Sequence, residues 1–126
     1  MINGAHVLLY SSDAEADRNF FRDVLNLKSV DAGHGWLIFA LPPGEAAVHP
    51  SEGSNRKDAQ AMLGAELYFM CDDIKATIKM LKGKNVTCAP VSEERWGIKT
   101  TLRLPSGGEV GLYQPKHPIA YNLNSK

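Results

Sequence analysis

Two residues that could do chemistry lie at matching places in a repeated stretch. The chain reads GAHVLLYSSD from residue 4 and GAELYFMCDD from residue 64. The third residue is His6 in the first copy and Glu66 in the second. An imidazole and a carboxylate can both ligate a divalent metal ion, and both can accept a proton from a substrate. This pair is therefore the first candidate for a functional site.

The elements that must position these two residues can be read from the same stretches. Each copy alternates apolar residues with a period of two, which predicts a β-strand. The first strand, at 5–10, would place His6, Leu8 and Tyr10 on one face. Each copy ends in Asp, which can cap a helix, and an apolar stripe at helical spacing follows. The sequence thus predicts the same strand-to-helix entry twice.

The repeat continues through the rest of each half. Three more strands are predicted in each half, at 28–31, 36–41 and 45–49 in the first and at 86–89, 99–104 and 109–113 in the second. The last two strands are joined by LPPGE in the first half and by LPSGGE in the second. The order strand–helix–strand–strand–strand therefore occurs twice. We expect an α+β fold, with helices on one face of each small sheet and the other faces curling around a shared cleft. The single domain at 1–126 would divide into modules at about 4–50 and 64–115, a linker at about 51–63, and a tail at 116–126.

Composition narrows the functional classes. Acidic and basic residues balance to a formal net charge of zero over 126 residues, which argues against a nucleic-acid-binding surface. No apolar run approaches the ~20 residues that a membrane-spanning helix needs, and we expect a cytoplasmic protein. Cys71 and Cys88 are expected to be free thiols rather than a disulfide.

Three segments carry a resemblance to a known family: HVLLYSSDAEADRNFFRDVLNL, CDDIKATIKMLKGKNV and WGIKTTLRLPSGGEVGLYQP, in that order. Together they resemble the glyoxalase/bleomycin resistance/extradiol dioxygenase superfamily, also called the vicinal oxygen chelate (VOC) fold. The resemblance implies two βαβββ modules that form an incomplete barrel around a cleft. It implies lyase, isomerase or dioxygenase chemistry, or drug sequestration without catalysis, and commonly a homodimer.

The resemblance also implies a ligand set for a divalent metal ion. His6 falls on the family's first ligand position, and Glu66 falls on the equivalent position of the second module. The last ligand position falls on Gly111, which has no side chain. Glu109 lies two residues earlier, on the same face of its strand, and is the expected shifted third ligand, with His49 as a further candidate. Such a site would suit iron, manganese, nickel or zinc.

Three hypotheses for these residues stay open. In the first, His6, Glu66 and Glu109 hold a metal ion, and Glu66 or Glu109 also moves a proton. In the second, the metal is lost and the same groups do acid–base work or bind a polar ligand. In the third, His6 and Glu66 only hydrogen-bond to each other.

The expected substrate contacts come from aromatic and basic residues of the predicted cleft: Tyr10, Tyr68, Tyr113 and Arg103. His117, in the tail, is expected to be exposed. The leading hypothesis is a glyoxalase- or dioxygenase-type enzyme that uses a divalent metal to polarise substrate oxygens. The alternative is a non-catalytic protein that binds and sequesters a small molecule. Neither hypothesis involves a nucleic acid or a membrane.

Overall fold

The computed structural model describes residues 1, 6–50 and 64–120. The predicted linker at 51–63 and the end of the tail lie outside these residues, as do Gly4 and Ala5. The helices are α1 (Ala14–Asp23) and α2 (Ile74–Gly83). The strands are β1 (Ser29–Asp31), β2 (Leu37–Phe39), β3 (Tyr68–Met70), β4 (Ser92–Glu94), β5 (Gly97–Arg103) and β6 (Glu109–Pro115).

Both helices begin where the sequence predicts a cap. The Asp13 carboxylate accepts a hydrogen bond from the backbone N–H of Ala16, and Asp73 does the same for Ala76. Such side-chain caps satisfy N–H groups that have no partner within the first helical turn. Asn26 and Asn85, shortly after the two helices, have φ angles of 59° and 66°. Asn tolerates this left-handed conformation, so each helix ends as the sequence predicts.

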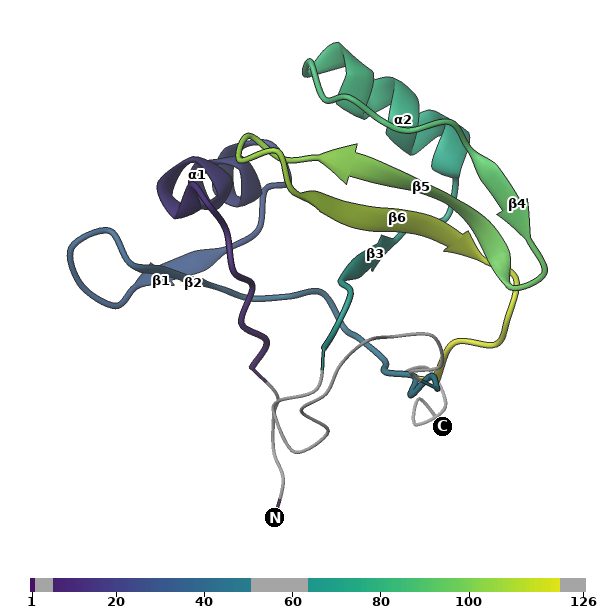
Figure 1. Ribbon diagram of the computed structural model, residues 1–126, viewed down its shortest axis with the longest axis horizontal. Helices are drawn as coiled ribbons and strands as arrows, with labels where there is room; N and C mark the ends of the chain where they lie inside the picture. Colours follow the sequence, from purple (N-terminus) through teal and green to yellow (C-terminus); the bar gives the residue numbers. More distant parts are fainter. Residues whose placement is uncertain (2–5, 51–63, 121–126) are drawn as a thin grey trace.

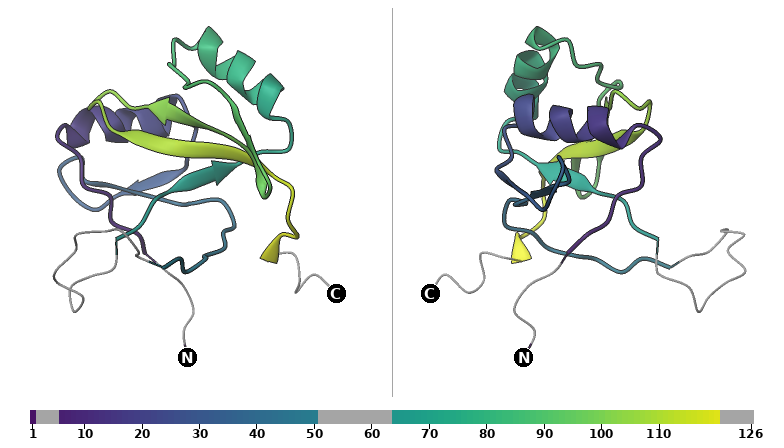
Figure 2. Two further views of the ribbon diagram at one scale, coloured as in Figure 1. Left: turned by 45° about the vertical axis from the view of Figure 1, so that its right-hand side comes forward. Right: turned by 90° about the vertical axis from the view of Figure 1, so that its left-hand side faces the viewer.

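The main sheet runs in the order β3-β6-β5-β4, with β3 parallel to β6 and the other pairs antiparallel. Both helices cover one face of this sheet (Figures 1 and 2). The core forms between the helices and the sheet, and its buried residues are Phe20, Phe21, Ile74, Leu81, Val86, Leu102, Leu104, Val110 and Leu112. Alternate residues of β6 and β5 point away from the helices, and this second face is available for a site.

In the second half, β3, β5 and β6 lie where strands are predicted, whereas β4 was not predicted. The strand predicted at 86–89 is present as a bridge between Cys88 and Leu102, with backbone hydrogen bonds on either side of it. In the first half, β1 and β2 pair in a hairpin whose turn contains Gly33 and Gly35 at positive φ. The Asp31 carboxylate accepts hydrogen bonds from both glycine N–H groups and so fixes this turn.

Two predicted strands of the first half are wrong for the residues that the structure describes. Residues 6–10 and 45–49 are not strands and are exposed. Alternation of apolar residues fixes which side chains would share a face, but a strand exists only where a second backbone pairs with it. The α+β class is confirmed, and the described sheets do not close into a barrel.

A buried carboxylate joins the two halves. Asp17 on α1 accepts hydrogen bonds from the Ser11 hydroxyl at 2.7 Å, the Ser106 hydroxyl at 2.7 Å and the Ser106 N–H at 3.1 Å. Ser106 lies in the turn between β5 and β6, so this network holds the first helix against the main sheet. In the described part of the chain, no helix is both long and apolar enough to cross a membrane.

Candidate functional site

Three aromatic side chains gather on the main sheet, outside the core between sheet and helices. Tyr68 comes from β3, Tyr113 from β6, and Trp96 from the turn between β4 and β5. Their ring centroids are 5.2–6.3 Å apart in all three pairs, and each pair is edge-to-face. The neighbours of these tyrosines, Phe69 and Leu112, pack in the core, so Tyr68 and Tyr113 face away from the helices. We call these three residues the aromatic cluster.

Two glycines make room for the cluster. Gly111 lies directly opposite Tyr68 in the parallel pair of β3 and β6. A Cβ atom at Gly111 would overlap the Tyr68 ring, whose Cγ lies 2.6 Å from that position. A Cβ atom at Gly97 would lie 2.7 Å from the Gln114 carbonyl oxygen and 3.1 Å from the Tyr113 ring. Both rings therefore lie on the sheet surface where other residues would carry side chains.

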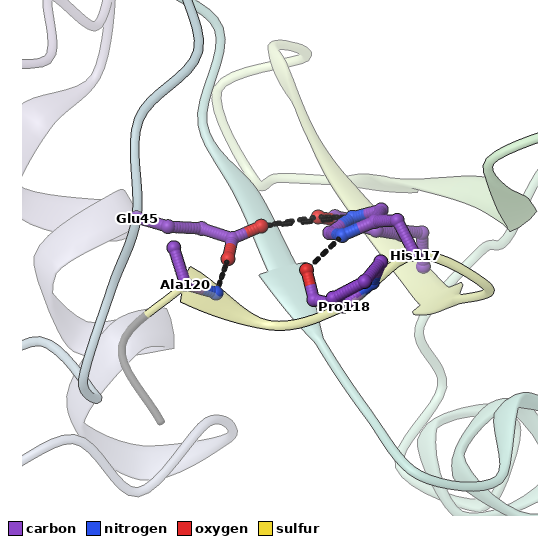
Figure 3. Close-up of polar contacts among 5 residues, drawn as sticks. Glu45, His117, Pro118 and Ala120 are labelled. Carbon is purple, nitrogen blue, oxygen red and sulfur yellow. Dashed lines mark hydrogen bonds and ion pairs between the residues drawn. The ribbon is translucent and has the colours of Figure 1, made fainter. Parts of the chain in front are cut away.

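A polar group borders the aromatic cluster. The Tyr113 hydroxyl oxygen lies 3.1 Å from His117 Nε2 and 3.4 Å from Glu45 Oε2. His117 Nε2 and Glu45 Oε2 are 3.6 Å apart, and Figure 3 shows these two side chains pointing toward each other. We call Glu45, Tyr113 and His117 the polar triad. Its members come from three parts of the chain: the segment after β2, strand β6 and the segment after β6.

Backbone contacts hold the polar triad in place. The N–H of Ala120 donates to Glu45 Oε1 at 2.8 Å. His117 Nδ1 lies 2.8 Å from the Pro118 carbonyl oxygen. Because a carbonyl oxygen can only accept, Nδ1 carries a proton, and a neutral His117 presents its lone pair on Nε2. This tautomer directs an acceptor toward Tyr113.

One basic side chain lies beside the cluster, and another lies farther along β5. The Lys99 ammonium group lies 5.6 Å from the centroid of the Trp96 ring, and Lys99 is the cross-strand neighbour of Tyr113. Arg103 is exposed and lies opposite Glu109 across β5 and β6. Lys99 thus brings a positive charge beside the aromatic rings, while the polar triad brings a carboxylate.

The predicted metal ligands form no metal-binding group in the part of the chain that the structure describes. His6, His49, Glu66 and Glu109 are all exposed. Across residues 6–50 and 64–120, no three His, Cys, Asp or Glu side chains lie close enough to hold a metal ion. Residue 6 lies on a segment that forms no strand, so no strand pairing holds it beside Glu109 at the start of β6. The described residues therefore do not fit a divalent metal, and we derive no step through one.

The other predicted residues divide into two groups. Tyr68 and Tyr113 lie in the aromatic cluster, as expected for one shared face. Tyr10 is 92% exposed and takes no part in the described ring contacts of the cluster. Whether Tyr68, Tyr113, Tyr10 or Arg103 contacts a substrate stays a prediction.

The sequence analysis missed part of the site. Glu45 and His117 were not expected to meet, and His117 was expected to be exposed. Instead its side chain is 31% exposed and lies against Glu45 and Tyr113. Glu45 and Tyr113 are 68 residues apart, and no local pattern reports such a contact. Gly97 beside Trp96 is a local signal that could have indicated the aromatic cluster, because a glycine in a strand often marks a close approach on a sheet.

The described hollows on the helix side of the sheet are small. One, of ≈ 290 Å³, lies between the helices and the end of β5, and another, of ≈ 210 Å³, lies between α2 and the sheet. Ligand pockets commonly span about 300–1,000 Å³. Both hollows are therefore smaller than a typical ligand pocket.

The two cysteines are free thiols. Burial raises the pKa of Cys71 and of Cys88 above the ordinary thiol value. A raised pKa keeps a thiol protonated at neutral pH, and the protonated form is a poor nucleophile and a poor metal ligand. Neither cysteine is a candidate for the site.

Comparison with known proteins finds a family whose model matches most of the chain. The model described as Glyoxalase/Bleomycin resistance protein/Dioxygenase superfamily matches residues 4–106. Similar solved structures include TnmS3, an antibiotic binding protein from Streptomyces sp. CB03234, at 21% identity and a TM-score of 0.57 over 92% of this chain and 100% of that chain. Lactoylglutathione lyase from Agrobacterium tumefaciens is 20% identical, with a TM-score of 0.60 over 89% and 92%. No protein with a curated description matches the chain at a significant level.

Proposed function

This chain belongs to the Glyoxalase/Bleomycin resistance protein/Dioxygenase superfamily, and on that premise we propose that it binds a flat aromatic small molecule on its aromatic cluster. The observation that carries the proposal is the meeting of Tyr68, Trp96 and Tyr113 on one sheet face. Aromatic rings favour edge-to-face or offset contacts with further rings, each worth about 0.5–1.5 kcal/mol beyond burial. Trp96 is 39% exposed, so part of the cluster is open to a ligand.

The environment of Gly111 favours binding over metal-dependent catalysis. The resemblance puts a metal ligand at position 111, and there the Tyr68 ring fills the space that a side chain would need. The leading enzyme hypothesis has no gathered ligand set among the described residues to support it. A divalent metal, and the roles of His6, Glu66 and Glu109, stay predictions from the resemblance.

The named neighbours are compatible with both functional classes. One is described as an antibiotic binding protein and another as a lactoylglutathione lyase. At 20–21% identity they share the fold with this chain, and one fold hosts many functions. The choice of a binding protein therefore rests on the aromatic cluster, and the antibiotic-binding neighbour is consistent with it.

Calorimetric titration with 2-methoxynaphthalene tests the proposal. We expect Trp96→Ala and Tyr68→Ala to weaken binding at least about tenfold, or about 1.4 kcal/mol. Trp36→Ala is the matched control, because Trp36 is an exposed tryptophan outside the cluster, with the Arg18 guanidinium group over its ring. Treatment with a chelator should leave the affinity unchanged. An equal loss in the Trp36 and Trp96 variants, or no binding to the wild type, would contradict the proposal.

We also propose that the protein forms a homodimer. Apolar side chains at Val7, Leu8 and Leu9 are exposed in this chain, and they follow the pattern of a strand that lacks a partner. A second copy that covers them would remove this apolar area from water. A cytoplasmic location and the two-module division stay predictions from the sequence.

A further inference from the structure

The polar triad lies beside the aromatic cluster because Tyr113 belongs to both. We propose that the triad recognises a hydrogen-bond donor on the ligand, and that this donor is a hydroxyl group carried by an aromatic ring. The inference rests on the proposed binding function and deepens it by naming the ligand class. It follows from a count of protons, from burial and from the charges nearby.

With His117 in its neutral form, the triad has more acceptors than protons. Three atoms of the triad face one another: the Tyr113 hydroxyl oxygen, His117 Nε2 and Glu45 Oε2. The proton on His117 Nδ1 is directed to the Pro118 carbonyl, so a neutral imidazole brings no proton into the triad. The tyrosine hydroxyl has one proton and can give it to Nε2 or to Oε2. One acceptor is therefore left facing another acceptor, and a second donor would satisfy it.

Burial makes this acceptor a selective one. The side chains of Glu45 and His117 are 18% and 31% exposed, although the Glu45 backbone is open to solvent. Most of the surface of these two side chains is therefore shielded from water, and a smaller part of it is exposed. A hydrogen bond to a partly shielded carboxylate is stronger than one in open water, and an unmet acceptor there is costly.

The neighbouring charges favour a neutral donor over a cationic one. Lys99 lies over the Trp96 ring, so an ammonium group on the ligand would approach a like charge at the cluster. Lys116 Nζ lies 2.6 Å from Glu93 Oε2, so this ammonium group is paired with Glu93 rather than with Glu45. A hydroxyl group attached to an aromatic ring is a neutral hydrogen-bond donor. Its ring can contact the aromatic cluster while its O–H reaches the triad.

The experiment compares 2-naphthol with its methyl ether, 2-methoxynaphthalene, by calorimetric titration. The two probes share the ring system, and only 2-naphthol can donate a hydrogen bond. We expect the wild type to bind 2-naphthol about tenfold more tightly. Glu45→Gln and His117→Asn should bring the ratio of the two affinities close to one, with the affinity for the methyl ether unchanged. Glu15→Gln, which removes an exposed carboxylate on α1 outside the triad, is the control and should keep the wild-type ratio.

The outcomes separate this inference from the function on which it rests. Equal binding of both probes by the wild type would overturn the inference and leave the binding function standing. A preference for 2-naphthol that survives in both triad variants would also overturn it, since the hydroxyl would then be recognised elsewhere. If neither probe binds, the binding function itself is overturned. The affinity for the methyl ether also reports whether each variant has kept its fold.

Discussion

At the scale of single residues, Gly111 determines where the Tyr68 ring can lie. The two residues are directly paired between β6 and β3, and the ring occupies the space of a side chain at 111. The sequence analysis identified Gly111 as a missing metal ligand. In the structure, the absence of a side chain at Gly111 allows the aromatic cluster to form.

The substitution Gly111→Ala tests this role. The new methyl group would meet the Tyr68 ring and force the ring or the strand to move, which we expect to lower the free energy of unfolding by about 1–3 kcal/mol. Urea denaturation followed by circular dichroism measures the change. Gly83→Ala is the matched control, because a Cβ atom there would have no atom within 4 Å. An equally stable Gly111→Ala protein would show that Tyr68 does not need this space.

At the scale of elements, α1 is held to the main sheet by one buried carboxylate. Asp17 accepts three hydrogen bonds, two of them from Ser106 in the turn between β5 and β6. These contacts link segments that are 89 residues apart. They position the first half against the second half. The segment that carries Glu45 belongs to the first half.

We expect Asp17→Ala to lower the free energy of unfolding by about 1–3 kcal/mol, because it leaves the Ser106 N–H without its acceptor. Thermal and urea unfolding would measure the loss. Glu15→Ala serves as the control, since Glu15 lies in the same first turn of α1 and is exposed. Equal effects of the two substitutions would mean that the contact with Ser106 contributes nothing beyond the helix terminus.

The elements also show which features a sequence can predict. Both helices were predictable because caps and apolar stripes are local, and β5 and β6 were predictable because turns separate them cleanly. The strands at 5–10 and 45–49 were wrong because pairing depends on backbone that is distant in sequence. For the same reason, alternation placed Tyr68 and Tyr113 on one face, whereas the contact between Glu45 and His117 left no local signal.

At the scale of the whole molecule, the exposed apolar segment 6–10 leads to a prediction about assembly. Analytical ultracentrifugation of the wild type should give a dimer, and Leu8→Lys should give a monomer. Leu8 is 64% exposed, so the change should not disturb the fold of one chain. Met80→Lys, at another exposed apolar residue, is the control and should stay dimeric. A monomeric wild type, or a dimer that persists in Leu8→Lys, would contradict this prediction.

One nuclear magnetic resonance titration tests the central claim most directly. The chain has two tryptophans, Trp36 and Trp96, and their indole N–H signals can be assigned from the Trp36→Phe variant. On addition of 2-methoxynaphthalene to ¹⁵N-labelled protein, we expect the Trp96 signal to shift in a saturable way while the Trp36 signal stays in place. A shift of the Trp36 signal alone, or of neither signal at saturating probe, would show that the aromatic cluster is not the binding site.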